Sequence, residues 1–469
     1  MSSTIACADL APALAREIAG LEIVTDAASV EAKSRDSWMR SLLESRRSGA
    51  PRAAVVVRPS SAAEVAAVLA FADRTRTPVV PFGLGSGVCG AVLADGNEII
   101  LDLSRMNRLL EINDLALTVR VEAGMRGSDF EEELNRRGYT MGHWPQSIGI
   151  STVGGWCATR ASGQLSTLYG NIEQMLLGCQ IALPGGRLMN LPAVTRSATG
   201  PDLRHLFLGS EGTLGVFTEL VLRIHPKAEA SVGRALSMPT LRSGLEALRE
   251  MLRAGWTPAV TRLYDATEAG RNFAVNADGN PVLLLMSEGA PDRVRTEMAA
   301  VLGIAHKHGG IDRGEEPVAS WIEHRNKVPS FEKLLAQGLV ADTIEVAIGW
   351  DRIGDLFDTV NQRGAAIPGV FAMSGHVSHC YTQGANIYFT FVAAESDPGA
   401  AIGIYDSAWR TTIETTIELG GTIAHHHGIG RVRKQWLRRE LGEGVELLAA
   451  LKRSFDPNGI MNPGVLIDA

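Results

Sequence analysis

The sequence predicts an α+β protein of several domains, with helical segments at both ends of the chain. A chain of 469 residues has room for about three domains of roughly 150 residues each. The first observation behind this fold class is a strand–helix–strand order that begins at Pro51 and is typical of a βαβ unit. The second is a helical spacing of apolar residues both before this block and after Ala401. The third is a middle block in which helices and apolar strands are mixed.

Residues 1–50 are predicted to be a helical N-terminal segment. Apolar residues recur at helical spacing in LAPALAREIAGLEIV, and the stretch WMRSLLESRRSGAP then closes with a glycine and a proline.

Residues 51–230 form the first large domain in this interpretation. AAVVVRPS is a β-branched strand, SAAEVAAVLAFADRT is an amphipathic helix that opens at a serine, and TPVVPFG is a second strand. Further strands are expected at NEIILDLS, LTVRVEAG and CQIALPGG, with a helix at SDFEEELNRRG. The block ends near GVFTELVLRIHPKAEA.

Residues 231–400 are predicted to form a second, α+β domain. LRSGLEALREMLRAG and VRTEMAAVLGIAHKHGG have helical periodicity, whereas PVLLLMSEG and TIEVAIGW have the composition of strands. Residues 401–469 form a C-terminal helical segment that encloses the loop GTIAHHHGIGRVRKQW.

Composition and charge exclude several classes of function. The 45 Lys and Arg against 52 Asp and Glu give a net charge of −7 without a block of like charges, which disfavours a nucleic-acid partner. Five scattered cysteines without a CxxC pair argue against disulfides and a cysteine-built zinc site. No apolar run reaches the ~18 residues of a membrane span, the N-terminus is a poor signal peptide, and the final LIDA is not a peroxisomal address. A cytoplasmic enzyme is therefore expected.

Three glycine-rich loops of the first domain point to a large polar cofactor. They are PFGLGSG, STVGGW followed by TRASG, and GSEGTLG. Glycines let backbone N–H groups approach an anion, and the adjacent hydroxyl residues can hydrogen-bond to a polar ligand. None of the loops is a GxGxxG or Walker motif, so a nicotinamide or P-loop nucleotide site is not indicated.

In this order, the loops resemble the FAD-binding domain of the vanillyl-alcohol oxidase/p-cresol methylhydroxylase superfamily. The ending FDPNGIMNPG resembles that of the lactate- and glycolate-oxidising members. The resemblance implies a two-lobed PCMH-type FAD-binding domain, an α+β cap domain of the FAD-linked oxidase C-terminal type, and a C-terminal segment that returns to the FAD side. Ser86 occupies the position where many relatives tether the flavin, so non-covalent FAD is expected, although Cys89 lies nearby.

The residues expected to bind FAD lie in or beside the three loops. They are Pro81, Phe82, Gly83, Leu84, Gly85, Ser86, Gly87, Gln146, Ser147, Ile148, Gly149, Ile150, Ser151, Thr152, Thr159, Arg160, Ala161, Ser162, Glu211, Gly212, Thr213, Leu214, Gly215, Val216 and Phe217.

The segment HHHGIGRVRKQW resembles the same region of the alkylglycerone-phosphate (alkyldihydroxyacetonephosphate) synthases, and so do YGNIE, TGPD and IYF. The resemblance implies Tyr388 as a catalytic residue and a histidine of the run as the base. Since the unperturbed pKa of a phenol is ~10, Tyr388 needs a neighbouring cation or histidine to work near neutrality. The catalytic residues expected are Tyr388, His425, His426 and His427, and the substrate-binding residues expected are Arg325, Arg262 and His143.

Structural roles for some of these residues stay open in the sequence. Arg262 could pair with Asp265, Tyr388 could be ordinary core, and LLLMSEG could belong to the core or to a lipid tunnel. Gln146 stands where the synthases have an acidic residue beside the flavin.

The reaction implied by the resemblance has no net redox change. Acyl-dihydroxyacetone phosphate forms an adduct at flavin N5, loses its fatty acid, accepts a fatty alcohol and leaves as the ether. The partners expected are this lipid-like phosphorylated substrate and the alcohol, together with peripheral membrane contact and, by family analogy, a homodimer.

The alternative is an FAD-dependent D-2-hydroxy acid dehydrogenase of the D-lactate or glycolate type. Such relatives carry a metal loop with the sequence GDGN, which is absent here, and no metal is expected. His426 stands at the position of that site's carboxylate, and His376, His379 and His426 could still bind zinc, because imidazole suits this metal. A flavin-binding sensor without enzymatic activity is a third, non-enzymatic class.

Overall fold

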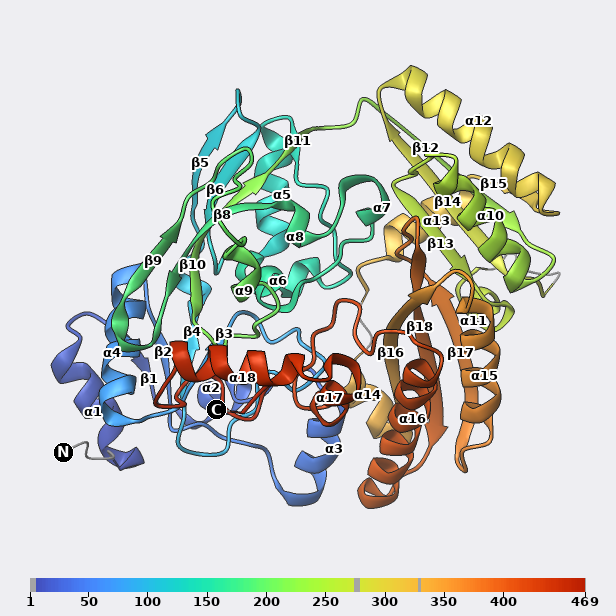
Figure 1. Ribbon diagram of the computed structural model, residues 1–469. Helices are drawn as coiled ribbons and strands as arrows, with labels where there is room; N and C mark the ends of the chain where they lie inside the picture. The colour runs from blue at the N-terminus through green and yellow to red at the C-terminus, as the bar shows by residue number, and fades with distance from the viewer. Residues whose placement is uncertain (1–5, 274–278, 328–329, 469) are drawn as a thin grey trace.

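The computed structural model describes residues 6–273, 279–327 and 330–468, which form two lobes and a C-terminal segment that joins them (Figure 1). The first lobe contains two main sheets, and the second lobe is built on one large sheet. In the described residues, no helix combines the length and the apolar character that crossing a membrane requires.

The smaller sheet of the first lobe contains the predicted βαβ unit. Helix α4 (Ala62–Thr75) connects β2 (Val55–Arg58) to β3 (Val79–Phe82), and β4 (Ile99–Asp102) lies between these strands, parallel to both. Ser61 caps α4 through its side chain, and the buried face of the helix carries Val65, Val68, Leu69 and Phe71. The strand–helix–strand prediction is therefore confirmed.

The N-terminal segment is not wholly helical. It contains α1 (Cys7–Glu17), α2 (Ala27–Lys33) and α3 (Met39–Ser48), but also β1 (Glu22–Val24), which pairs antiparallel with β2. Gly20 adopts φ +84°, which ends the helical path, so the apolar residues after it extend along the sheet edge.

The larger sheet of the first lobe is antiparallel, with strand order β5-β6-β10-β8-β9. The second glycine-rich loop lies among the short helices and turns that connect the strands of this sheet. Helix α6 begins within this loop. The elements of this part are β5 (Leu109–Asn113), β6 (Thr118–Glu122), α5 (Gly127–Arg136), β7 (Tyr139–Thr140), α6 (Val153–Thr159), α7 (Ser166–Tyr169), α8 (Ile172–Met175), β8 (Leu176–Ala182), β9 (Leu188–Leu191), α9 (Arg204–Phe207), β10 (Val216–Arg223) and β11 (His225–Pro226), with 3-10 helices η1 (Leu103–Arg105), η2 (Ile148–Ile150) and η3 (Pro184–Gly186).

The second lobe is a seven-stranded antiparallel sheet with strand order β15-β12-β14-β13-β17-β18-β16. Its strands are β12 (Ala230–Ser237), β13 (Val260–Tyr264), β14 (Val282–Gly289), β15 (Ile311–Gly314), β16 (Leu339–Gly349), β17 (Val370–Val377) and β18 (Gly384–Ala394). Its helices are α10 (Leu241–Arg253), α11 (Ala266–Asn272), α12 (Pro291–Lys307), α13 (Glu316–His324), α14 (Phe331–Ala336), α15 (Ile353–Ala365) and α16 (Pro398–Glu418).

The register of this sheet aligns four polar and aromatic residues in one transverse row. Glu345 on β16 lies opposite Tyr388 on β18, Tyr388 lies opposite His376 on β17, and His376 lies opposite Tyr264 on β13. Residues directly opposite each other across strands project to the same face of a sheet. This row, Glu345–Tyr388–His376–Tyr264, is called the cross-strand row below.

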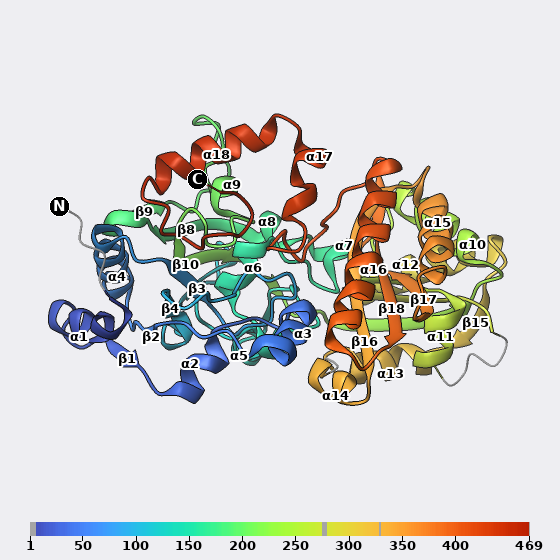
Figure 2. The same cartoon turned by 90° about the horizontal axis from the view of Figure 1, so that it is seen from below.

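After α16 the chain returns to the first lobe, where α18 lies along it (Figure 2). The segment contains η4 (Lys434–Trp436), α17 (Leu437–Leu441) and α18 (Gly444–Phe455), and Gly442 at φ +54° separates the last two helices. The buried Lys452 ammonium binds the Asp456 carboxylate and the carbonyls of Thr213 and Met461. These bonds fix the end of the chain to the first lobe.

Candidate active site

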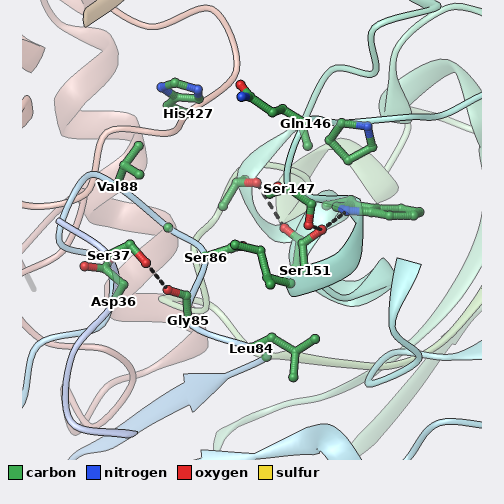
Figure 3. A pocket seen from close by; sticks show the side chains of 18 of the residues that line it. Asp36, Ser37, Leu84, Gly85, Ser86, Val88, Gln146, Ser147, Ser151 and His427 are labelled. Carbon is green, nitrogen blue, oxygen red and sulfur yellow. Dashed lines mark hydrogen bonds between the residues drawn. The ribbon is translucent and has the colours of Figure 1, made fainter. Parts of the chain in front are cut away.

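A cavity of about 1810 Å³ lies between the lobes, and all three glycine-rich loops line it. The first lobe contributes its glycine-rich loops, the second lobe contributes Arg262, His376 and Tyr388, and the C-terminal segment contributes His426 and His427. Figure 3 shows Gly85, Ser147 and His427 around the same space. Since drug-sized ligands usually occupy about 300–1,000 Å³, this cavity has room for a dinucleotide and a substrate.

Most of the residues expected to bind FAD line this cavity, and three do not. Those that line it are Pro81, Phe82, Gly83, Leu84, Gly85, Ser86, Gly87, Gln146, Ser147, Ile148, Gly149, Ile150, Ser151, Thr152, Thr159, Ala161, Ser162, Glu211, Gly212, Gly215, Val216 and Phe217. The Arg160 side chain instead turns to Glu173, the Thr213 carbonyl accepts a hydrogen bond from Lys452, and Leu214 is buried in the core.

Backbone geometry in these loops suits a ligand that lies close to the main chain. A Cβ at Gly83 would come within 2.6 Å of Thr152 Oγ1, and one at Gly212, where φ is +74°, within 2.8 Å of Pro81 Cγ. Only glycine lets the first loop pack this closely on the other two. The backbone groups that remain along the cavity wall, with the nearby serine and threonine hydroxyls, suit the phosphates and ribose of FAD.

The geometry around Cys89 favours FAD held without a covalent bond. The thiol is 1% exposed, lies 2.9 Å from Arg433 Nη1 and is absent from the cavity lining, and burial raises its pKa. We expect acid precipitation of the purified protein to leave all flavin in the supernatant, with an unchanged result for Cys89→Ser. Flavin fluorescence that stays with the precipitated chain would contradict this prediction.

Tyr388 and the histidine run form one hydrogen-bonded chain. Tyr388 Oη lies 2.6 Å from His426 Nε2, His426 Nδ1 lies 2.7 Å from His425 Nδ1, and His425 Nε2 lies 2.6 Å from Tyr381 Oη. Burial raises the pKa of Tyr388 and lowers that of His426, so both groups are neutral at pH 7. Tyr388 therefore has the histidine partner that the sequence analysis required of it.

His427 lines the cavity beside this chain. Burial lowers the pKa of its imidazole to about 3, and its Nδ1 has no hydrogen-bond partner among the described residues. This nitrogen lies 3.9 Å from Glu345 Oε1, so the partly exposed remainder of the His427 side chain is what meets the cavity.

One carboxylate holds the whole histidine run, and the sequence analysis missed it. Glu345, fully buried, accepts the backbone N–H groups of His425 at 2.6 Å, of His426 at 3.3 Å and of His427 at 2.9 Å. The buried Arg433 guanidinium lies 3.1 Å from the same carboxylate. Burial acts to raise the pKa of Glu345, but the Arg433 charge, the histidine run and the backbone N–H bonds together outweigh burial and lower that pKa. The one charged residue in the apolar strand TIEVAIGW was the available signal.

The two predicted substrate-binding arginines meet at one indole ring. The guanidinium carbons of Arg262 and Arg325 lie 5.3 Å and 5.5 Å from the Trp321 ring centre, and that of Arg325 also lies 4.5 Å from the Trp144 ring centre. Arg262 lines the cavity, whereas Arg325 lies behind Trp144. Burial lowers the pKa of Arg325 to about 10, which still leaves it cationic at pH 7.

The other roles considered for these positions fit the geometry less well. Arg262 Nε donates to Tyr264 Oη rather than to Asp265, which caps α11. His143 does not line the cavity; its ring packs on Trp156, and burial lowers its pKa to about 3.

The three histidines considered as zinc ligands make separate contacts. His376 Nδ1 binds Glu268 and His379 Nδ1 binds Ser166 Oγ. Within the described ranges, Glu345, His425 and His426 have the spacing of a metal site, but backbone N–H groups and Arg433 already occupy this carboxylate.

Glu211 joins the C-terminal segment to the first lobe. It accepts the backbone N–H groups of Ile429 at 2.7 Å and Gly430 at 2.9 Å, and burial raises its pKa to about 7 from 4.5. The folded protein therefore holds a proton here that the unfolded chain releases, so this stability is present below pH 4.5 and is lost as the pH rises to 7.

Glu211→Gln should remove this pH dependence. We expect the urea midpoint of the variant to fall less than that of the unchanged protein between pH 5 and pH 7.5, with Glu219→Gln, at a partly exposed position of β10, as control. Parallel midpoints for Glu211→Gln and the unchanged protein would contradict the assignment.

Together, the glycine-rich cradle and the buried acid–base groups around one cavity define a flavin-binding enzyme. The family model "FAD binding domain" matches residues 53–192, and "FAD linked oxidases, C-terminal domain" matches residues 227–466. The chain belongs to the FAD-linked oxidase family and binds FAD, and the two-lobed PCMH-type fold with its cap domain is confirmed.

Similar proteins carry several descriptions, among them FAD-linked oxidoreductase, alkyldihydroxyacetonephosphate synthase, glycolate oxidase subunit and D-lactate dehydrogenase. The "Uncharacterized FAD-linked oxidoreductase YgcU" of Escherichia coli strain K12 is 33% identical over 431 residues, 89% of each chain. An alkyldihydroxyacetonephosphate synthase of Trypanosoma brucei brucei is 30% identical over 448 residues, 88% of this chain and 73% of the other. A solved alkyldihydroxyacetonephosphate synthase shares the fold with a TM-score of 0.82 and 24% identity, over 99% of this chain and 86% of that chain.

Proposed function

We propose that this protein exchanges the acyl chain of acyl-dihydroxyacetone phosphate for a fatty alcohol, as an FAD-dependent enzyme of the alkyldihydroxyacetonephosphate synthase type. The observation that carries the proposal is the 2.6 Å bond between Tyr388 Oη and His426 Nε2 at the wall of the cavity shared with the flavin loops. Bound FAD would supply an electrophilic ring there.

The Tyr388–His426 pair would take a proton from the substrate carbon beside the carbonyl. Both groups are neutral, so Tyr388 can give or receive a proton only in concert with His426. His425 and Tyr381 continue the chain of hydrogen bonds away from the cavity, which gives the proton a route off His426. Tyr388 and His426 would thus act together to remove a C–H proton from the substrate.

Arg262, at the cavity wall, would bind the phosphate, and Arg325, behind Trp144, would add its positive charge. Both guanidinium groups lie at Trp321. Within the described residues, neither arginine forms a direct ion pair with a carboxylate. One planar guanidinium can donate two N–H groups to two phosphate oxygens, so Arg262 is a suitable anchor for the phosphate.

An anaerobic titration of the purified yellow protein tests the proposal. Acyl-dihydroxyacetone phosphate should bleach the flavin absorbance and release fatty acid, and added hexadecanol should yield the labelled ether. The Arg262→Lys variant should need a higher substrate concentration for the same bleaching. Absence of fatty-acid release and of ether would refute the proposal.

Oxidation of a D-2-hydroxy acid is the competing function. The arginine pair would bind a carboxylate as readily as a phosphate, and His376 and Arg271 line the same wall. In this case D-lactate or D-2-hydroxyglutarate would reduce the flavin and pass electrons to an artificial acceptor.

We also propose that the protein acts as a cytoplasmic homodimer that collects its lipid substrates by peripheral contact with a membrane. Long acyl and alkyl chains partition into bilayers, so a membrane surface is where both substrates are concentrated. Light scattering and co-sedimentation with phospholipid vesicles test the dimer and the contact separately.

A further inference from the structure

A second acid–base pair faces the cavity next to Tyr388. His376 Nδ1 lies 2.6 Å from Glu268 Oε2, and both residues line the cavity. His376 comes from β17 and Glu268 from α11, so the pair joins two elements of the second lobe. The proton chemistry assigned above to Tyr388 and the histidine run makes no use of it.

The cross-strand row fixes the position of the His376 ring. It stacks between Tyr264, at 5.1 Å and 26°, and Tyr388, at 4.7 Å and 12°. The ring is therefore held parallel to that of Tyr388, one strand away from it. A single substrate in the cavity can meet both residues.

Charges and hydrogen bonds around the pair fix its proton. Burial acts to raise the pKa of Glu268, but the contacts with His376, with Thr390 and with Arg271, 3.7 Å away, together outweigh burial and lower that pKa. Burial lowers the pKa of His376. At pH 7 an ionised Glu268 thus faces a neutral imidazole, and since a carboxylate only accepts, His376 donates from Nδ1.

The lone pair of His376 is consequently on Nε2. Over the described residues, nothing hydrogen-bonds to this nitrogen, and it is absent from the buried polar atoms that lack partners. The side chain is 13% exposed and lines the cavity, so Nε2 is open to a ligand. A neutral imidazole oriented by a carboxylate is a common arrangement for a general base.

We propose that His376, oriented by Glu268, accepts the proton of an aliphatic hydroxyl group of the substrate. The inference rests on the proposed function, in which the hydroxyl belongs to the incoming fatty alcohol; in the competing function it is the 2-hydroxyl of the acid. The O–H bond breaks, the proton goes to His376 Nε2, and the electron pair stays on the oxygen. In the exchange reaction this oxygen forms the ether bond to the carbon that the fatty-acid carboxylate has left with its bonding pair.

The test separates this hydroxyl proton from the C–H proton. His376→Asn keeps an amide donor for Glu268 but has no base, and Glu268→Gln keeps the shape without the charge. His308→Asn is the matched control, because His308 Nε2 lies 2.8 Å from Glu250 Oε2 outside the cavity. All three variants are assayed as holoenzymes with equal flavin content.

We expect His376→Asn to incorporate labelled hexadecanol at least ~10²-fold more slowly, while acyl-dihydroxyacetone phosphate still exchanges its C1 hydrogen with solvent at a rate within about threefold. Glu268→Gln should lose about tenfold, as a variant that removes an orienting partner. If D-lactate is the substrate instead, its oxidation should show the same losses. Equal loss of hydrogen exchange and alcohol incorporation, or no loss in either reaction, would overturn the proposal.

A binding measurement tests the role of His376 even if the protein catalyses neither alcohol incorporation nor oxidation of a 2-hydroxy acid. Flavin difference spectra should show that the holoenzyme binds 1-octanol about tenfold more tightly than 1-methoxyoctane, which has no hydroxyl proton to donate, and that His376→Asn loses this preference. Equal preference in both proteins would refute the role of His376. Failure of the proposed function alone would leave the preference intact.

Discussion

Tyr388→Phe should keep FAD bound and lose turnover by a factor of ~10² to 10⁴, the usual contribution of a general acid–base group. The phenyl ring preserves the stack on His376, but removal of the hydroxyl leaves His426 Nε2 without its 2.6 Å partner. The C–H proton then loses the acceptor that the Tyr388–His426 pair provides. Steady-state turnover and the rate of C1 hydrogen exchange both measure the loss.

Tyr381→Phe is the control for this prediction. Tyr381 Oη lies at the other end of the hydrogen-bonded chain, on His425, and does not line the cavity. Its removal should cost far less turnover than that of Tyr388. Full activity of Tyr388→Phe would take Tyr388 out of the mechanism.

Glu345→Leu should destabilise the fold by about 3–5 kcal/mol, because it strands a buried charge on Arg433 and three backbone N–H groups of the histidine run. Urea denaturation measures this effect through the shift of the midpoint. The exposed pair Arg242–Asp355 serves as control, and Asp355→Leu should change stability by less than about 1 kcal/mol.

A second substitution makes the prediction specific. Glu345→Leu combined with Arg433→Met should recover part of the loss, since no buried charge is then left alone. Losses that simply add would show that the two residues stabilise the protein independently.

The helices and strands of the fold were easier to predict from the sequence than the pairing between them. The βαβ unit was predictable because Ser61 caps α4 and its apolar face repeats at helical spacing. Strand β1 was not, because three residues after a glycine carry no periodicity, and their extended form depends on pairing with β2.

The candidate site was predictable where its residues are neighbours in the chain. The glycine-rich loops and the histidine run stand out as local patterns. Glu345 lies 80 residues from His425, and Glu268 lies 108 residues from His376. No local sequence pattern therefore predicts that these residues meet. Arg160 differs from its neighbours in the glycine-rich loop, since its side chain points to Glu173.

The alignment of Glu345, Tyr388, His376 and Tyr264 on adjacent strands has an evolutionary consequence. Of these residues, Tyr388 and His376 line the cavity, so substitution of either alters the reactive groups at the cavity wall without any change in the lobe that holds the nucleotide. Related proteins can therefore diverge by single substitutions in this row. Cofactor binding is then retained while the reaction at the opposite wall of the cavity changes.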